Sequence, residues 1–284
     1  MDSEALLQRV DALFHASGCA TDAQALTELA TQGADGAVKS GAVASSIVYG
    51  ELLSPLSVFQ LLDLDQEDTF YDLGSGRGQV VLAAAFAGVS KRAVGVELLE
   101  ARHQAALGAK AVAPEEVQRQ CDFRCQDALT CDLQDASKVY LCNAAFPRHL
   151  NASFARSLGP WRAPKLAALV TCAALPEEAL RDATLKLARI GMCTATWARD
   201  GAPLFLYKRG PIETATPHQL PEKVRYEASR QMAAAAEKPS LSFEDECGLL
   251  RSAALAAAFG EKTKLRWSKR RHSGLSFFGV GTPG

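Results

Sequence analysis

The chain has 284 residues, of which 48% are hydrophobic and 22% charged, and its formal net charge is -1. This composition is ordinary for a globular protein, and the near-neutral charge gives no overall attraction to nucleic acid or to a membrane surface. No apolar run reaches the roughly 18 residues that a membrane-spanning helix needs, and the N-terminus lacks a signal-peptide pattern. The eight cysteines include no Cys-x-x-Cys pair, so we expect reduced thiols in a cytosolic or nuclear protein and no metal site.

The first part of the chain predicts a small helical lobe. Residues 3–16 place their apolar side chains on one helical face, and residues 22–32 repeat the pattern more weakly. Residues 33–46 are rich in Gly, Ala and Ser without a period, which indicates a loop. A further helix is expected within residues 52–64.

The central part of the chain alternates predicted strands with predicted helices. Such alternation predicts an α/β fold with a doubly wound, mostly parallel sheet of seven strands. The Asp200-Gly201 dipeptide is expected to turn the last two strands into an antiparallel hairpin. The expected strands are 69–73, 92–97, 122–125, 138–143, 166–173, 192–197 and 204–208, and the expected helices are 79–87, 100–112, 150–158 and 177–188.

The last part of the chain is interrupted by prolines and carries helical patterns at 222–236 and 246–259. Residues 261–272 include six basic side chains, which could dock on an anionic surface, act as a nuclear localisation signal, or form only a solvated charge run. We therefore expect three parts: residues 1–46, a core domain of residues 47–210, and an extension of residues 211–284. The six basic residues are Lys262, Lys264, Arg266, Lys269, Arg270 and Arg271.

A glycine-rich loop joins the first core strand to its helix, in the stretch Asp72-Leu73-Gly74-Ser75-Gly76-Arg77-Gly78-Gln79. Glycine lets a ligand lie against bare backbone, and the N–H groups of the following helix then face that ligand. A dinucleotide-binding loop needs a third spaced glycine where Gln79 stands. The Asp-x-Gly-x-Gly-x-Gly spacing is instead typical of class I methyltransferases that bind S-adenosylmethionine. The alternative is a glycine-rich loop without a ligand.

Carboxylates follow the first three predicted strands, at the sheet edge where open α/β folds bind ligands. Asp72 could order the glycine loop or accept a hydrogen bond from a ligand amino group. Glu97 could accept both hydroxyls of a ribose. Asp127, with Ala128 beside it, is expected where an adenine edge would lie. For each carboxylate the alternative is an ordinary surface position.

The fourth predicted strand ends in Asn143-Ala144-Ala145-Phe146. The Asn143 carbonyl could accept a hydrogen bond from an incoming amine and turn the lone pair of that amine toward a methyl donor, which is catalysis by placement. The alternative is a turn asparagine followed by a core phenylalanine.

Together these stretches resemble the non-SET histone H3 lysine methyltransferases that are named for disruption of telomeric silencing, over residues 43–210. The resemblance implies transfer of a methyl group from S-adenosylmethionine to a lysine of the nucleosome core surface, histone H3 as partner, and a nuclear location. It places Tyr49 and Glu51 in the loop over the cofactor, with Glu51 in contact with it, and Asn143 and Trp197 along the lysine channel. Tyr49, Asn143 and Trp197 are the catalytic residues that it implies. It also implies cofactor contacts for Asp72, Gly74, Ser75, Gly76, Gly78, Gln79, Glu97, Asp127, Ala128 and Asn143. The matching pieces are residues 48–52, 72–81, 95–97, 143–146 and 194–197.

The chain also departs from the family pattern. Cys142 stands where the family has a first asparagine, and Ala128 where an aromatic residue often follows the acid. On the last strand, where the family has paired tyrosines, this chain has Leu204, Phe205 and Tyr207.

Three alternatives to a histone methyltransferase remain: a lysine methyltransferase of other proteins, a methyltransferase of amino groups on nucleic-acid bases, and a chromatin-binding pseudoenzyme. For an amine acceptor we expect an apolar channel lined by Val48, Phe146, Trp197 and Phe205.

Overall fold

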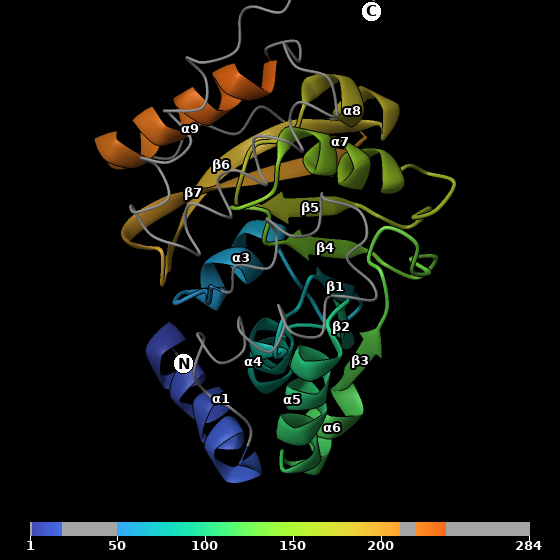
Figure 1. The fold of residues 1–284 in the computed structure, drawn as a ribbon, viewed down its shortest axis with the longest axis vertical. Coiled ribbons are helices and arrows are strands. Elements are labelled where there is room, and N and C mark those ends of the chain that lie inside the picture. The colour runs from blue at the N-terminus through green and yellow to red at the C-terminus, as the bar shows by residue number, and fades with distance from the viewer. Residues whose placement is uncertain (1, 19–49, 211–219, 237–284) are drawn as a thin grey trace, which may run out of the picture.

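The computed structural model describes residues 2–18, 50–210 and 220–236, which form a sheet with helices on both faces (Figure 1). The strands are β1 (Thr69–Leu73), β2 (Arg92–Glu97), β3 (Cys121–Cys125), β4 (Lys138–Leu141), β5 (Ala168–Thr171), β6 (Leu185–Ala195) and β7 (Ala198–Arg209). The helices are α1 (Ser3–Ser17), α3 (Pro55–Leu62), α4 (Gln79–Ala87), α5 (Glu100–Ala111), α6 (Glu115–Gln120), α7 (Arg148–Ser157), α8 (Glu177–Asp182) and α9 (Glu222–Ala236).

The seven strands lie in the order β3-β2-β1-β4-β5-β7-β6, which confirms the expected doubly wound sheet. β1 to β5 pair in parallel, whereas β7 is antiparallel to both β5 and β6. The strand order reverses between β1 and β4. Ligands of open α/β sheets bind at the carboxyl ends of the strands beside such a reversal, so the fold itself indicates where a site should lie.

Two apolar clusters pack the two faces of the sheet. The first contains the buried side of α1 and residues of α3, α4 and α6, and the second contains residues of α7, α8 and α9. α4 is apolar around almost its whole circumference, which suits a helix buried between the sheet and α1. The predicted apolar face of α1 is confirmed, because Leu6, Val10, Leu13 and Phe14 are all buried. α1 therefore packs on α4 and α5 within the first cluster (Figure 1).

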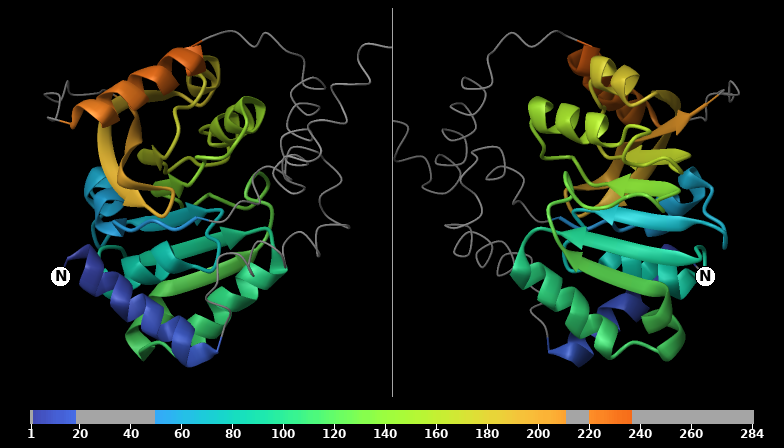
Figure 2. Two further views of the ribbon diagram at one scale, coloured as in Figure 1. Left: turned by 60° about the vertical axis from the view of Figure 1, so that its left-hand side comes forward. Right: turned by 90° about the vertical axis from the view of Figure 1, so that its right-hand side faces the viewer.

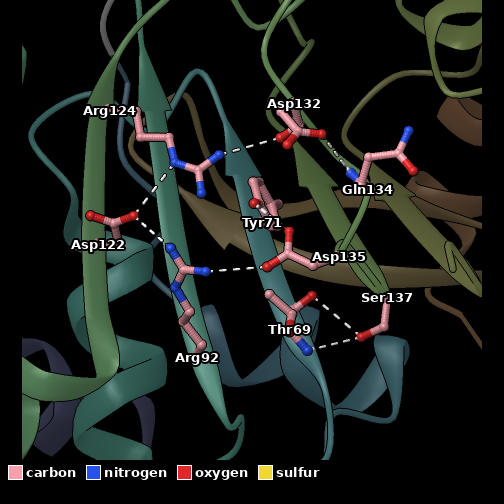
Figure 3. Close-up of polar contacts among 9 residues, drawn as sticks. All are labelled: Thr69, Tyr71, Arg92, Asp122, Arg124, Asp132, Gln134, Asp135 and Ser137. Carbon is pink, nitrogen blue, oxygen red and sulfur yellow. Dashed lines mark hydrogen bonds and ion pairs between the residues drawn. The ribbon is translucent and has the colours of Figure 1, made fainter. Parts of the chain in front are cut away.

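A polar network covers part of the second face, at strands β1 to β3 (Figure 3). Arg92 forms ion pairs with Asp122 at 2.7 Å and with Asp135 at 3.2 Å. The Tyr71 hydroxyl donates to Asp135 at 2.7 Å, and burial together with this hydrogen bond raises the pKa of Tyr71. The Arg124 guanidinium lies 5.4 Å from the centre of the Tyr71 ring. Through Asp135, the network fixes the segment between β3 and β4 to the sheet. The same segment carries Asp127.

The final hairpin differs from the prediction. The turn lies at Thr196–Trp197, because Ala195 pairs with Ala198, and the expected Asp200-Gly201 turn is wrong since both residues lie within β7. The predicted helix over 177–188 ends at Asp182, and β6 begins at Leu185. The helix α6 was not predicted.

α9 confirms the helix expected at 222–236 and lies against the β6–β7 hairpin (Figure 2). Val224 and Ala228 are its buried side chains. Among the described residues there is no helix whose length and apolar character would let it cross a membrane. The patterns at 22–32, 33–46 and 246–259 and the basic residues of 261–272 lie outside the described residues.

Candidate functional site

A cavity of about 670 Å³ opens at the carboxyl ends of the central strands. It brings together side chains from the glycine loop, from the ends of β1 and β2, from the segment after β3, and from the tip of the β6–β7 hairpin. Eleven of the residues proposed from the sequence line it: Glu51, Asp72, Gly74, Ser75, Gly76, Gln79, Glu97, Asp127, Ala128, Phe146 and Trp197. Gly78 and Asn143 are not among the lining residues, and Tyr49 lies outside the described residues.

The glycine loop is folded tightly over the end of β2. The Gly74 and Ser75 N–H groups both donate to the Val96 carbonyl, at 2.8 and 3.1 Å. The Gly76 N–H donates to one Glu97 carboxylate oxygen at 2.8 Å, and the Leu99 N–H donates to the other at 2.9 Å. Gly74 and Gly76 have φ values of 81° and 55°, a left-handed conformation that favours glycine. Glu97 therefore holds the loop and faces the cavity at the same time.

Gly78 serves packing instead of lining the cavity. A Cβ at this position would lie 2.5 Å from the Phe123 ring, and the residue has a φ of 87°. The same ring would meet a Cβ at Gly95. The two glycines thus let the glycine loop, β2 and the Phe123 ring on β3 approach one another. This packing accounts for Gly78, which the sequence had suggested as a cofactor contact.

Asp72 is a buried acid in the wall of the cavity. It is only 2% exposed, and its Oδ1 has no hydrogen-bond partner among the described residues. Burial raises the pKa of the Asp72 carboxyl well above its usual value, and Cys142 and Glu97 raise it further. The Ser75 hydroxyl is also buried and without a partner in the described part. Because buried polar atoms need partners, both atoms fit a ligand that brings hydrogen-bond donors or a positive charge.

The opposite wall is apolar, and the sequence did not reveal it. Leu98, Leu99, Leu129 and Phe154 line this part of the cavity, and the Phe154 ring stacks on Phe146 at a centroid distance of 5.5 Å. Asp127 lies exposed at the rim, where its carboxylate accepts from the Leu129 N–H at 2.8 Å. Leucines that follow a strand are too common to mark a site, so only the folded arrangement identifies them.

Two motifs that are distant in the sequence interlock over the cavity. The Glu51 N–H donates to the Thr196 hydroxyl at 3.0 Å, and the Thr196 N–H donates to the Glu51 carbonyl at 2.9 Å. A Cβ on Gly50 would lie 2.5 Å from the Trp197 ring, so the absence of a side chain there lets the indole pack closely. Trp197 is nevertheless 42% exposed, because it stands at the hairpin tip.

Asn143 lies behind the cavity wall. It is fully buried, its Oδ1 accepts from the Ala173 N–H at 2.7 Å, and its Nδ2 donates to Asn151 at 2.7 Å and to the Ala173 carbonyl at 3.1 Å. Its neighbours Ala144 and Ala145 line the cavity instead. The side-chain carbonyl of Asn143 is therefore directed to the Ala173 N–H, and not into the cavity where an amine acceptor was expected. A catalytic role for Asn143 stays a prediction, and its contacts are those of a residue that positions the chain after β4.

A second cavity, of about 580 Å³, lies between the hairpin and α9 and shares Ala144 and Trp197 with the first. Its lining includes Lys223 and Tyr226 of α9, and the Tyr226 side chain is 70% exposed. Trp197 therefore stands at the junction of the two cavities. The prediction that Phe205 lines the same channel is wrong, because this side chain is fully buried in the second apolar cluster.

The family model for histone methylation protein DOT1 matches residues 36–158, which confirms the resemblance over that segment. The matched residues include the glycine loop, Glu97 and Asn143, whereas Trp197 and α9 lie beyond them. No curated protein matches the chain.

Several solved structures are similar to part of the chain at low identity. A protein in the NADB-Rossmann superfamily from Streptococcus agalactiae is 15% identical, with 56% of this chain and 70% of that chain covered and a TM-score of 0.43. An RNA methyltransferase from Salinibacter ruber in complex with S-adenosyl-L-homocysteine is 22% identical, with 59% and 93% covered and a TM-score of 0.37. Magnesium protoporphyrin IX methyltransferase from Synechocystis PCC 6803 with bound SAM is 19% identical, with 54% and 76% covered and a TM-score of 0.43. These similarities concern the fold alone.

Proposed function

We propose, from the premise that residues 36–158 match the DOT1 histone methylation family, that the protein transfers a methyl group from S-adenosylmethionine to a lysine of histone H3 on the nucleosome core surface. The family match and the strand order support a methyltransferase, and the identity of the acceptor is our own step. One observation carries the proposal. The glycine loop, the Glu97 carboxylate and the interlocked Glu51 and Trp197 segments all meet at one cavity.

The cavity residues fit S-adenosylmethionine. Glu97 would accept the ribose hydroxyls, since a carboxylate at the end of the second strand serves that purpose in nucleotide-binding α/β folds. The apolar wall of Leu98, Leu129 and Phe154 would hold the adenine, with Asp127 at its rim. Asp72 would meet the positively charged amino group, which supplies the partner that its buried Oδ1 lacks in the described part of the chain. When bound, the cofactor supplies an electrophilic methyl group.

The acceptor would reach this methyl group past Trp197. A lysine amine must be neutral to attack, and its ordinary pKa is about 10.4. Apolar surroundings disfavour the ammonium form, and Ala144 and Trp197 at the junction of the two cavities, with Phe146 in the first cavity, provide such surroundings. The described residues thus contribute by excluding water and by orienting the amine. The second cavity gives the rest of the acceptor chain a place to lie.

The decisive experiment offers labelled S-adenosylmethionine in parallel to nucleosomes, free histones, DNA and RNA. We expect label on histone H3 within nucleosomes. Label on another protein would replace histone H3 with a different lysine acceptor. Label on DNA or RNA would support base methylation instead. Cofactor binding without transfer to any acceptor would identify a pseudoenzyme.

A further inference from the structure

Arg77, within the glycine loop, is only 4% exposed although its side chain carries a charge. Its Nε donates to the Glu51 carboxylate at 2.5 Å. Its Nη2 lies 3.4 Å from the Asp11 carboxylate, and its guanidinium carbon lies 4.0 Å from the centre of the Phe14 ring. The Arg77 side chain therefore joins three segments of the chain, namely α1, the segment that contains Glu51, and the glycine loop.

These three contacts offset part of the cost of burying the guanidinium. A buried charge is costly unless oppositely charged partners and hydrogen bonds compensate for lost water, and an aromatic face adds further attraction. The Glu51 side chain is 19% exposed and the Asp11 side chain 49% exposed, so the pair with Glu51 is the better shielded. The contact with Asp11 is longer and more exposed to solvent, and it is the weaker of the two ion pairs.

α1 is suited to hold Arg77 in a fixed place. The Asp2 side chain caps its first turn by accepting from the Ala5 N–H at 2.8 Å, and Gly18 ends the helix in a left-handed conformation. Its buried face joins the apolar cluster that contains α4, the helix following the glycine loop. Asp11 and Phe14 are therefore presented to Arg77 by a helix with defined ends and a packed face.

We propose that Arg77 is a positioning residue through which α1 holds the Glu51 carboxylate and the glycine loop ready for the cofactor. Arg77 does not line the cavity, whereas Glu51 does, so its action passes through Glu51 and through the loop backbone. Asp11 and Phe14 then belong to the cofactor site without touching the cofactor. The inference rests on the proposed function in one respect, because it takes S-adenosylmethionine as the ligand.

The first test needs no ligand. Hydrogen exchange of the backbone amides of residues 74–79 is compared in the wild type, Asp11→Asn and Phe14→Leu. We expect exchange to rise roughly threefold in Asp11→Asn, because a half-exposed ion pair contributes only modestly to loop closure. Glu4→Gln is the matched control: it removes one carboxylate from the same helix, at a side chain that accepts a 3.5 Å hydrogen bond from Gln8, and it should leave the loop unchanged.

The second test measures S-adenosylmethionine affinity by calorimetry. Asp11→Asn should weaken binding roughly threefold with a thermal midpoint within about 2 °C of the wild type. Arg77→Gln should weaken it by about tenfold or more, because Glu51 loses its shielded partner. Arg77→Lys should restore part of the loss, since a lysine can pair with one carboxylate but lacks the planar fork for two.

The outcomes separate the two proposals. Unchanged loop exchange and unchanged affinity in both Asp11→Asn and Phe14→Leu would overturn the role of α1. A wild type that does not bind S-adenosylmethionine would overturn the proposed function, while the exchange data would still decide whether α1 holds the loop. If Arg77→Gln fails to fold, the partly exposed Asp11→Asn variant remains decisive.

Discussion

At the scale of single residues, Asp72 shows a conflict between stability and ligand binding. Its pKa in the folded protein lies above the value in an unfolded chain, chiefly because burial disfavours the charged form. The folded state therefore binds this proton more tightly than the unfolded state does. The favourable contribution is present below the unfolded pKa and is lost as the pH rises through the folded pKa, so this buried carboxyl group makes the free protein less stable at neutral pH than at low pH.

Asp72→Asn should accordingly stabilise the protein without cofactor and weaken cofactor binding. We expect a higher thermal midpoint at neutral pH, a flatter dependence of that midpoint on pH, and an affinity for S-adenosylmethionine reduced by about tenfold or more. Scanning fluorimetry over a pH series and calorimetry would measure these quantities. Glu116→Gln, an exposed carboxylate on α6, is the control for the loss of one charge. A midpoint that stays the same or falls would contradict the assignment of Asp72 as an uncompensated buried acid.

Gly50 and Trp197 make a second prediction at this scale. Gly50→Ala would place a Cβ against the indole, which must then move, since the built Cβ lies 2.5 Å from the ring. We expect transfer to the acceptor to fall more than cofactor affinity, because Trp197 stands at the junction of the two cavities.

A double-mutant cycle checks that the effect passes through the ring. In a Trp197→Ala background the added methyl group at position 50 has nothing to displace, so Gly50→Ala should change neither transfer nor tryptophan fluorescence any further. Additive losses in the double variant would show that the glycine serves the backbone instead.

At the scale of elements, the sequence predicts the helices and strands whose ends carry a clear local signal, such as a glycine or a charged residue. β1, β2 and α4 have the expected bounds, because each apolar run is limited by the glycine loop or by charged residues. The hairpin turn could not be predicted in this way, since the register of β6 on β7 is set by pairing along both long strands and overrides the local Asp200-Gly201 signal. The same holds within the site. Residues in the glycine motif were found, whereas the partners of Arg77 depend on how α1 packs.

The network on β1 to β3 gives a prediction for an element that carries part of the site. Arg92→Ala should lower the free energy of unfolding by about 1 kcal/mol, because the lost pairs with Asp122 and Asp135 are only half-buried. Urea denaturation measures the change. Arg119→Ala on α6 is the matched control, since its pair with Glu115 is largely exposed and should contribute less than about 0.5 kcal/mol. Equal effects in the two variants would mean that the network adds nothing beyond surface pairing.

At the scale of the whole molecule, the donor side and the acceptor side rest on different grounds. The proposed donor side lies mostly within the segment that matches the DOT1 family, and only Thr196 and Trp197 of the first cavity lie beyond it. The proposed acceptor side, the second cavity, is lined mostly by the β6–β7 hairpin and α9, which lie beyond residue 158. Changes in α9 should therefore act on the choice of acceptor, while cofactor affinity stays the same.

The basic segment at the end of the chain extends this division. Deleting residues 261–284 removes Lys262, Lys264, Arg266, Lys269, Arg270 and Arg271, and we expect weaker binding to nucleosomes with unchanged affinity for S-adenosylmethionine. Contacts between basic side chains and DNA release counterions, so the wild type should lose affinity steeply with added salt and the truncated chain less steeply. Replacing the six residues by glutamine is the matched control for length. Binding that is identical across the salt series would exclude this segment from nucleosome recognition and leave the hairpin and α9 as the elements to test.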